Sequence, residues 1–134
     1  MNILTDVANS VDAKVCLPFT AKTTDTAGVS VDCRTWDLQH AAVLVIGAVT
    51  DGTHLPQVQE SSDGSTWTAI TTFTAFTSGA ANTNGTTVKQ VLNFKRNYRY
   101  VRGTMTATTI TSGGVYGILL LGQKKQTGGT VQTT

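Results

Sequence analysis

Two histidines are the residues best suited to acid/base or metal chemistry in this sequence. His54 shares a short polar segment with Asp51, and a histidine beside a carboxylate can form half of an acid/base pair or of a metal site. No third ligand stands near them in the sequence, and His40 lies in a different segment. We therefore expect His54 to pack or hydrogen-bond within its segment, and we predict no catalytic residue, no metal site and no cofactor.

The acidic residues give little basis for catalysis either. A glycosidase needs two carboxylates about 5 to 9.5 Å apart across a cleft. The chain has a single glutamate, Glu60, and most of its aspartates stand in loops or at strand ends, where such side chains bond backbone amides. The sequence contains no nucleophile elbow, no phosphate-binding glycine loop before a helix and no zinc motif. We predict that the protein is not an enzyme.

The two cysteines, Cys16 and Cys33, are too few for a disulfide scaffold and lack the spacing of a metal site. We expect both to be small buried hydrophobes. A bridge between them is geometrically possible if the segments around Val15 and Val31 pair as neighbouring strands. The sequence does not decide whether they pair.

Basic and aromatic residues alternate in the segment 95–102, Lys-Arg-Asn-Tyr-Arg-Tyr-Val-Arg. This pattern is typical of single-stranded nucleic-acid binding, in which cations hold phosphates and rings stack on bases. Alternation places Tyr98, Tyr100 and Arg102 on one face of a strand. We favour a strand whose tyrosines enter the core and whose basic residues lie at its ends or at a subunit contact, so nucleic acid is not an expected partner. The predicted assembly contacts are Lys95, Arg96, Arg99 and Arg102.

The charges are divided unevenly along the chain. Residues 1–63 contain all eight acidic residues and three basic ones, a net charge of −5, whereas residues 64–134 contain seven basic residues and no acidic one, a net charge of +7. This division can give a surface with two electrical ends, suited to docking with an oppositely charged partner. Antiparallel pairing that mixes both halves in one sheet would cancel it, and we favour that outcome.

Apolar alternation predicts strands along most of the chain. Residues 11–19 alternate with period two, and Pro18 assigns the end of this strand to an edge or a bend. The run 41–48 is apolar at every position, so we expect a central strand with both faces buried. Further strands are expected at 29–33, 57–60, 67–76, 87–94, 98–107 and 114–121, with loops at 51–56 and 78–86.

Asp63 and Gly64 predict a hairpin turn, because Asp-Gly supplies the positive φ values that a tight turn between twisted strands requires. The surrounding residues, 61–67, resemble the Asp-box hairpin of sialidase-like propellers. Here the box occurs once and lacks the usual spacer residue. We therefore interpret it as a structural turn with Trp67 packed beneath it.

The composition agrees with an all-β domain. The 134 residues suffice for one domain, 26 of them are threonine, and threonine suits pleated strands. A net charge of +2 with 40% hydrophobic residues argues against disorder, the apolar runs are too short to span a membrane, and no secretory signal is evident. We predict one antiparallel β-sandwich, jelly-roll or immunoglobulin-like, of about seven to nine strands. The predicted parts are an N-terminal arm at 1–10, the sandwich at 11–123 and a flexible polar tail at 124–134.

Four segments in combination resemble small structural proteins encoded among the virion genes of tailed bacteriophages. They are residues 45–54 (VIGAVTDGTH), 58–64 (VQESSDG), 98–102 (YRYVR) and 115–122 (VYGILLLG). The resemblance covers roughly residues 38 to 123. It implies a non-enzymatic β-sandwich protein of the phage head, namely a decoration or cement protein that is made in the host bacterial cytoplasm and binds the capsid surface.

The resemblance also implies partners. These are the major capsid protein or other virion proteins, together with further copies of the chain, and a trimer at a threefold position of the shell is the first expectation. A role in the tail or at the head-to-tail junction is the nearest alternative. From other classes, the alternatives are a single-stranded nucleic-acid-binding module that uses the basic and aromatic segment, and a carbohydrate-binding module that presents Trp36 and Trp67.

Overall fold

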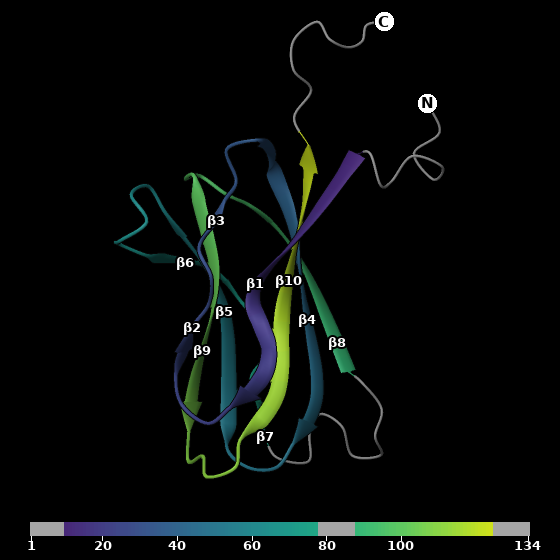
Figure 1. Ribbon diagram of the computed structural model, residues 1–134, viewed down its shortest axis with the longest axis vertical. Coiled ribbons are helices and arrows are strands. Elements are labelled where there is room, and N and C mark those ends of the chain that lie inside the picture. Colours follow the sequence, from purple (N-terminus) through teal and green to yellow (C-terminus); the bar gives the residue numbers. More distant parts are fainter. Residues whose placement is uncertain (1–9, 78–87, 125–134) are drawn as a thin grey trace, which may run out of the picture.

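A computed structural model describes residues 10–77 and 88–124 of the chain. Two antiparallel sheets pack face to face (Figure 1). Sheet A has four strands, in the order β1 (Val11–Lys22), β10 (Gly114–Lys124), β4 (Trp36–Val49) and β8 (Val88–Lys95). Sheet B has the order β2 (Thr26–Ala27), β9 (Tyr100–Thr108), β5 (Thr53–Ser61) and β6 (Thr68–Thr72), with β3 (Val31–Asp32) beside β9 and β7 (Phe76–Thr77) beside β5.

This architecture confirms the predicted all-β antiparallel sandwich. The described residues form ten strands, three of which are only two residues long. No helix in the described part of the chain is long and apolar enough to cross a membrane. The predicted loop at 78–86, the tail after Lys124 and all but the last residue of the predicted N-terminal arm lie outside the described residues.

The core fills the space between the sheets, because alternate residues of each strand point inward. Leu44 and Ile118 of sheet A and Val58 and Val101 of sheet B are fully buried. The cysteines lie in the same core as free thiols, so they do not pair in this structure. Burial raises the pKa of Cys16 to about 12 and that of Cys33 to about 11, which keeps both thiols protonated at neutral pH.

The two halves of the chain alternate strand by strand in both sheets. In sheet A, β1 and β4 come from residues 1–63, whereas β10 and β8 come from the later half. Sheet B alternates in the same way, and the Arg99 guanidinium binds the Asp32 carboxylate across the halves at 2.7 Å. The favoured outcome for the charges, mixing within each sheet, is confirmed.

Two predicted boundaries are wrong around β5 and β6. The expected loop at 51–56 ends early, because β5 begins at Thr53 and includes Pro56. The amide of Phe73 donates to the Pro56 carbonyl at 3.1 Å, so the backbone polar groups of Pro56 point away from β9 and its missing N–H costs no bond to that strand. The expected strand at 67–76 is divided into β6 and β7, and the register of β5 with β6 shifts between Val58 and Gln59, where Ile70 of β6 has no partner in the pairing.

The sequence predicted the edge position of β1 correctly. β1 lies at one edge of sheet A, and its register with β10 shifts on both sides of Leu17, close to Pro18. The buried ammonium of Lys22 holds this irregular segment by donating to the carbonyls of Pro18, Thr20 and Tyr116. Burial lowers the pKa of Lys22, and these three carbonyls offset part of the cost of burying its charge.

Candidate docking face

The outer face of sheet A is apolar, although it faces solvent. A continuous row crosses all four strands, because Val15 pairs with Leu119, Leu119 with Val43, and Val43 with Val91. We call the following eight side chains the apolar face: Val15, Phe19, Val43, Val45, Val91, Val115, Leu119 and Leu121. Val15, Phe19, Val91 and Val115 are 43%, 45%, 57% and 42% exposed, and the other four are half-buried.

Phe19 owes its place on this face to a glycine. A Cβ at Gly117 would lie only 2.7 Å from the Phe19 Cγ, so the ring lies over the bare backbone of β10. The ring therefore extends the apolar face along β10 rather than entering the core.

The outer face of sheet B is polar, unlike that of sheet A. Its central rows pair Arg102 with Gln59 and Thr104 with Gln57, which is the polar surface expected of a sheet that faces water. Sheet A lacks this alternation in β4. The prediction that residues 41–48 are buried on both faces is therefore wrong for the chain alone, since the structure covers only the inner face. An apolar sheet face of this extent is typical of a binding surface.

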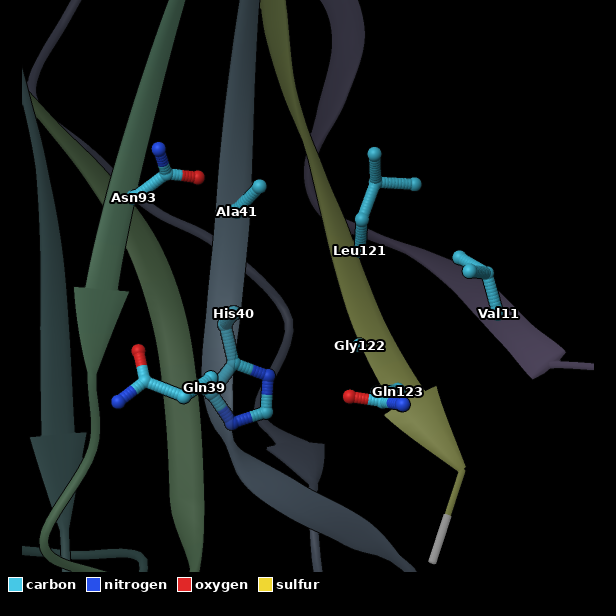
Figure 2. Close-up of a pocket in the computed structure, with 8 residues that line it drawn as sticks. All are labelled: Val11, Gln39, His40, Ala41, Asn93, Leu121, Gly122 and Gln123. Carbon is cyan, nitrogen blue, oxygen red and sulfur yellow. The ribbon is translucent and has the colours of Figure 1, made fainter. Parts of the chain in front are cut away.

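A hollow continues the apolar face at the end of sheet A where β1 begins and β10 ends. It has a volume of about 330 Å³. Its base is the next row of the sheet, in which Leu121 pairs with Ala41 and Ala41 with Asn93 (Figure 2). The remaining lining residues are Val11, Gln39, His40, Gly122 and Gln123. Three of the lining residues carry amide side chains, which are uncharged and both donate and accept hydrogen bonds.

A buried cation supports the strands beneath the hollow. The Arg96 guanidinium donates to the carbonyls of Cys33 at 2.6 Å, Trp36 at 2.8 Å and Tyr98 at 3.0 Å, and its Nε donates to Nε2 of His40 at 2.9 Å. Because a guanidinium only donates, neutral His40 carries its proton on Nδ1. Burial, followed by the charge of Arg96, lowers the pKa of His40 to about 4. The ring is therefore neutral at physiological pH.

The four predicted assembly contacts differ in exposure. Lys95 and Arg99 are exposed and Arg102 is half-buried, but Arg96 is 5% exposed and its donors are engaged within the chain. Arg96 is therefore not available to a partner, for the physical reason that its charge stabilises the loop between β3 and β4. Contact through the other three stays a prediction.

The aromatic residues of the same segment also lie differently from the prediction. Tyr98 is exposed and Tyr100 is half-buried on the outer face of sheet B, so the expectation that both enter the core is wrong. The guanidinium of Arg102 lies 4.3 Å from the ring centre of Trp67 and donates to Gln59 at 3.0 Å. With Arg99 bound to Asp32, these arginines already have partners within the chain.

The pair formed by His54 and Asp51 is structural. His54 is fully buried; its Nε2–H donates to the Asp51 carbonyl at 3.0 Å, and its Nδ1 accepts from the Tyr116 hydroxyl at 3.2 Å. The Asp51 carboxylate accepts from the backbone amides of Thr111, Ser112 and Gly113. Asp51 thereby fastens the loop before β10 to the loop before β5. No group of residues in the described part of the chain has the arrangement of a metal site.

An Asp51→Ala variant should be less stable than wild type at pH 7, with a thermal midpoint lower by several degrees. The amide of Gly113, then those of Ser112 and Thr111, lowers the pKa of Asp51 in the folded protein. A depressed carboxyl pKa contributes stability above the unfolded pKa of about 3.9, and this contribution is lost as the pH falls through the folded pKa. The difference in stability between the variant and wild type should therefore shrink as the pH falls from about 5 to about 2. Denaturant unfolding across this range measures it, and an Asp37→Ala control changes the same charge without touching the loop.

Two further acidic residues hold turns. Glu60 is buried, and its Oε2 accepts from the amides of Asn97 at 2.6 Å and Tyr98 at 3.2 Å, which fixes the turn between β8 and β9. Asp63 accepts from the amides of Ser65 and Thr66, and these bonds lower its pKa to about 2. Gly64 follows with a φ of 77° in the connection between β5 and β6.

The tryptophans do not form an exposed pair. Trp36 is 1% exposed and its Nε1–H donates to Asp12 at 3.2 Å, while Trp67 is half-buried under Arg102. A sugar-binding platform built from these two rings is therefore not present.

Sequence reasoning missed the apolar face as a surface. The signal was present in β4, where small and branched apolar residues occupy outward as well as inward positions. It was read as burial within the chain because a single sequence does not show how many layers cover a sheet.

Solved structures with this fold include proteins of several kinds. The SPBc2 prophage-derived protein YomS matches with a TM-score of 0.50 and 13% identity, over 85% of this chain and 95% of that one. A protein of Bacillus endospore appendages, described as disulfide-linked pili, matches with a TM-score of 0.45 and 14% identity, over 87% and 90%. The xylan-binding module CBM15 matches with a TM-score of 0.47 and 14% identity, over 90% and 94%.

No family model matches the chain, and no curated protein matches its sequence. The structural likeness defines the class of fold, an antiparallel β-sandwich module. At these identities it defines the fold alone.

Proposed function

We propose that the protein is a non-enzymatic structural protein of a phage particle, and that it decorates and reinforces the head. The observation that carries the proposal is the contrast between the two outer faces of the sandwich. A domain with a polar outer face on sheet B and an uncovered apolar face on sheet A is suited to permanent assembly, because the apolar face gains from being covered. The prophage origin of YomS, a protein with the same fold, is consistent with this setting.

The polar residues that could have served catalysis support a non-enzymatic role. His54, Asp51 and Glu60 are each held in hydrogen bonds that fix loops or turns. Their groups stabilise the sandwich, which is what a structural protein requires of them.

Contact with the shell would use the exposed basic residues. Lys95 and Arg99 lie on the surface, and positive charge steers a protein toward an acidic shell and sets its orientation more than its affinity. A Lys95→Ala variant should bind more slowly and lose much of its salt dependence while remaining folded.

The experiment adds purified full-length protein to phage heads that lack it and measures co-sedimentation and the temperature at which the heads open. Wild type should bind and raise that temperature. Val91→Asp should reduce binding at least tenfold, because covering the apolar face in the assembled particle would bury its carboxylate against apolar surface. Thr104→Asp, which places the same charge on the outer face of sheet B, should bind as wild type does. Heads that neither bind nor gain stability contradict the decoration role, and binding to isolated tails instead would assign the protein to the tail.

A further inference from the structure

The apolar face is large enough for a specific protein contact. Strands lie about 4.8 Å apart and rise about 3.3 Å per residue, so four strands over the length from Val115 to Gln123 present roughly 19 by 26 Å, or about 500 Å². Two such faces in contact bury about 1,000 Å², which is near the lower limit for a specific interface. The face therefore suits a contact between two surfaces of its own size.

The middle of the face carries no charge. The row Val15, Leu119, Val43 and Val91 is wholly apolar, and the adjacent row, from Ala13 through Leu121 and Ala41 to Asn93, is apolar or neutral. Within these two rows, two copies can therefore meet without like-charge repulsion. The exposed lysines of β8, Lys89 and Lys95, lie in the rows on either side, where they pair with Val45 and Gln39. An acidic or basic partner would find no opposite charge in the two middle rows.

The face combines a row of large apolar side chains with an adjacent hollow, so it can complement itself in a two-fold contact. The raised row of valines and leucine and the hollow over Ala41 lie in adjacent rows, about 7 Å apart along the strands. In a two-fold contact each copy presents the same patch. If a first residue of one copy contacts a second residue of the other, the second residue of the one also contacts the first residue of the other. A two-fold axis between the rows places the raised row of each copy over the hollow of the other. The amides of Gln39, Asn93 and Gln123 line the hollow at one end of the contact.

We propose that the occupant of the apolar face is the same face of a second copy of this chain, so that two sandwiches pack sheet A against sheet A. This contact closes with two copies and differs from the trimer that the sequence led us to expect. The role of the dimer rests on the proposed function, because in that case the dimer is the unit that joins the particle. Its test needs no particle.

Light scattering and sedimentation of the full chain test the proposal. Wild type should reach twice the 14.1 kDa of the chain, with a dissociation constant of about 1 to 100 μM, as suits a small interface. Val91→Asp, at the most exposed position of the face, and Val43→Asp, at its centre, should each weaken the dimer about a hundredfold. Thr104→Asp should leave the dimer unchanged. Circular dichroism checks that the variants are folded, and Val91→Asp decides the question if Val43→Asp does not fold.

Several results overturn the proposal. They are a wild-type chain that stays monomeric at about 1 mM, a trimeric mass, and a dimer that both aspartate variants leave intact. A monomer whose binding to heads depends on Val91 would show that the shell covers the face, which rejects the dimer and keeps the proposed function. A dimer that does not bind heads would reject the proposed function and keep the dimer.

Discussion

An Arg96→Ala variant should unfold roughly 10 to 20 °C below wild type, corresponding to a loss of about 3 to 5 kcal/mol. Arg96 is buried without a carboxylate partner, and its guanidinium satisfies the carbonyls of Cys33, Trp36 and Tyr98 together with Nε2 of His40. Truncation leaves at least two of these acceptors buried without a donor, and each such loss costs about 1 to 3 kcal/mol. Thermal unfolding followed by circular dichroism measures the shift.

Two neighbouring variants serve as controls for Arg96. Lys95→Ala removes an exposed charge from the adjacent position and should shift the midpoint by less than about 2 °C. Arg96→Lys keeps the charge but cannot reach four acceptors with the geometry of a guanidinium, so it should fall between wild type and alanine. An alanine variant as stable as the Lys95 control would show that the buried network contributes nothing.

Gly122→Ala should destabilise the sandwich by about 2 to 4 kcal/mol, because there is no room for a methyl group beneath the hollow. A Cβ at Gly122 would lie 1.9 Å from Cε3 and 2.2 Å from Cδ2 of Trp36. Trp36 is 1% exposed and also packs beside His40, so its ring cannot move aside without disturbing the core. Urea unfolding at neutral pH measures the difference in free energy.

The matched control for this clash is Gly47→Ala. Gly47 lies in the adjacent strand of the same sheet, where an added Cβ approaches the Val115 carbonyl oxygen at 3.3 Å. This substitution should cost less than about 1 kcal/mol. Equal losses at the two glycines would mean that a general cost of adding a Cβ in sheet A, rather than the Trp36 ring, explains the effect at Gly122.

Local pattern was enough to predict the sandwich and most of its strands. Residues 11–19 and 98–107 alternate with period two, and both lie largely within strands. The inward face was harder to predict than the strand, because Leu17 is buried whereas Val15 and Phe19 point outward. The pattern was misleading at Pro56, because whether a proline interrupts a strand depends on which neighbour its missing N–H would have faced. At Pro56 the answer depends on two neighbours of β5. These are β9 on one side and the break between β6 and β7 on the other.

The site was predictable only in part, because burial is a property of pairs of elements. Lys95, Arg96, Arg99 and Arg102 look alike in sequence, yet one is buried, one is bound to Asp32 and one lies over Trp67. The acceptors that draw Arg96 inward are backbone carbonyls as far away in sequence as Cys33, and carbonyls leave no signal in a sequence. The apolar outward positions of β4 did leave a signal, but not the identity of the layer that covers them.

The position of β10 between β1 and β4 has a consequence for how the chain is made. During synthesis β1 emerges first, but both of the long pairings in the middle of sheet A wait for residues 114–124. The nascent chain therefore cannot close its sandwich on the ribosome before that strand is released, and closing such distant contacts is slow, on the order of milliseconds to seconds. Until then the apolar face lacks the strand that carries Val115, Leu119 and Leu121. A surface that is ready to bind thus arises only after β10 has joined the sheet, which delays assembly until the sandwich has folded.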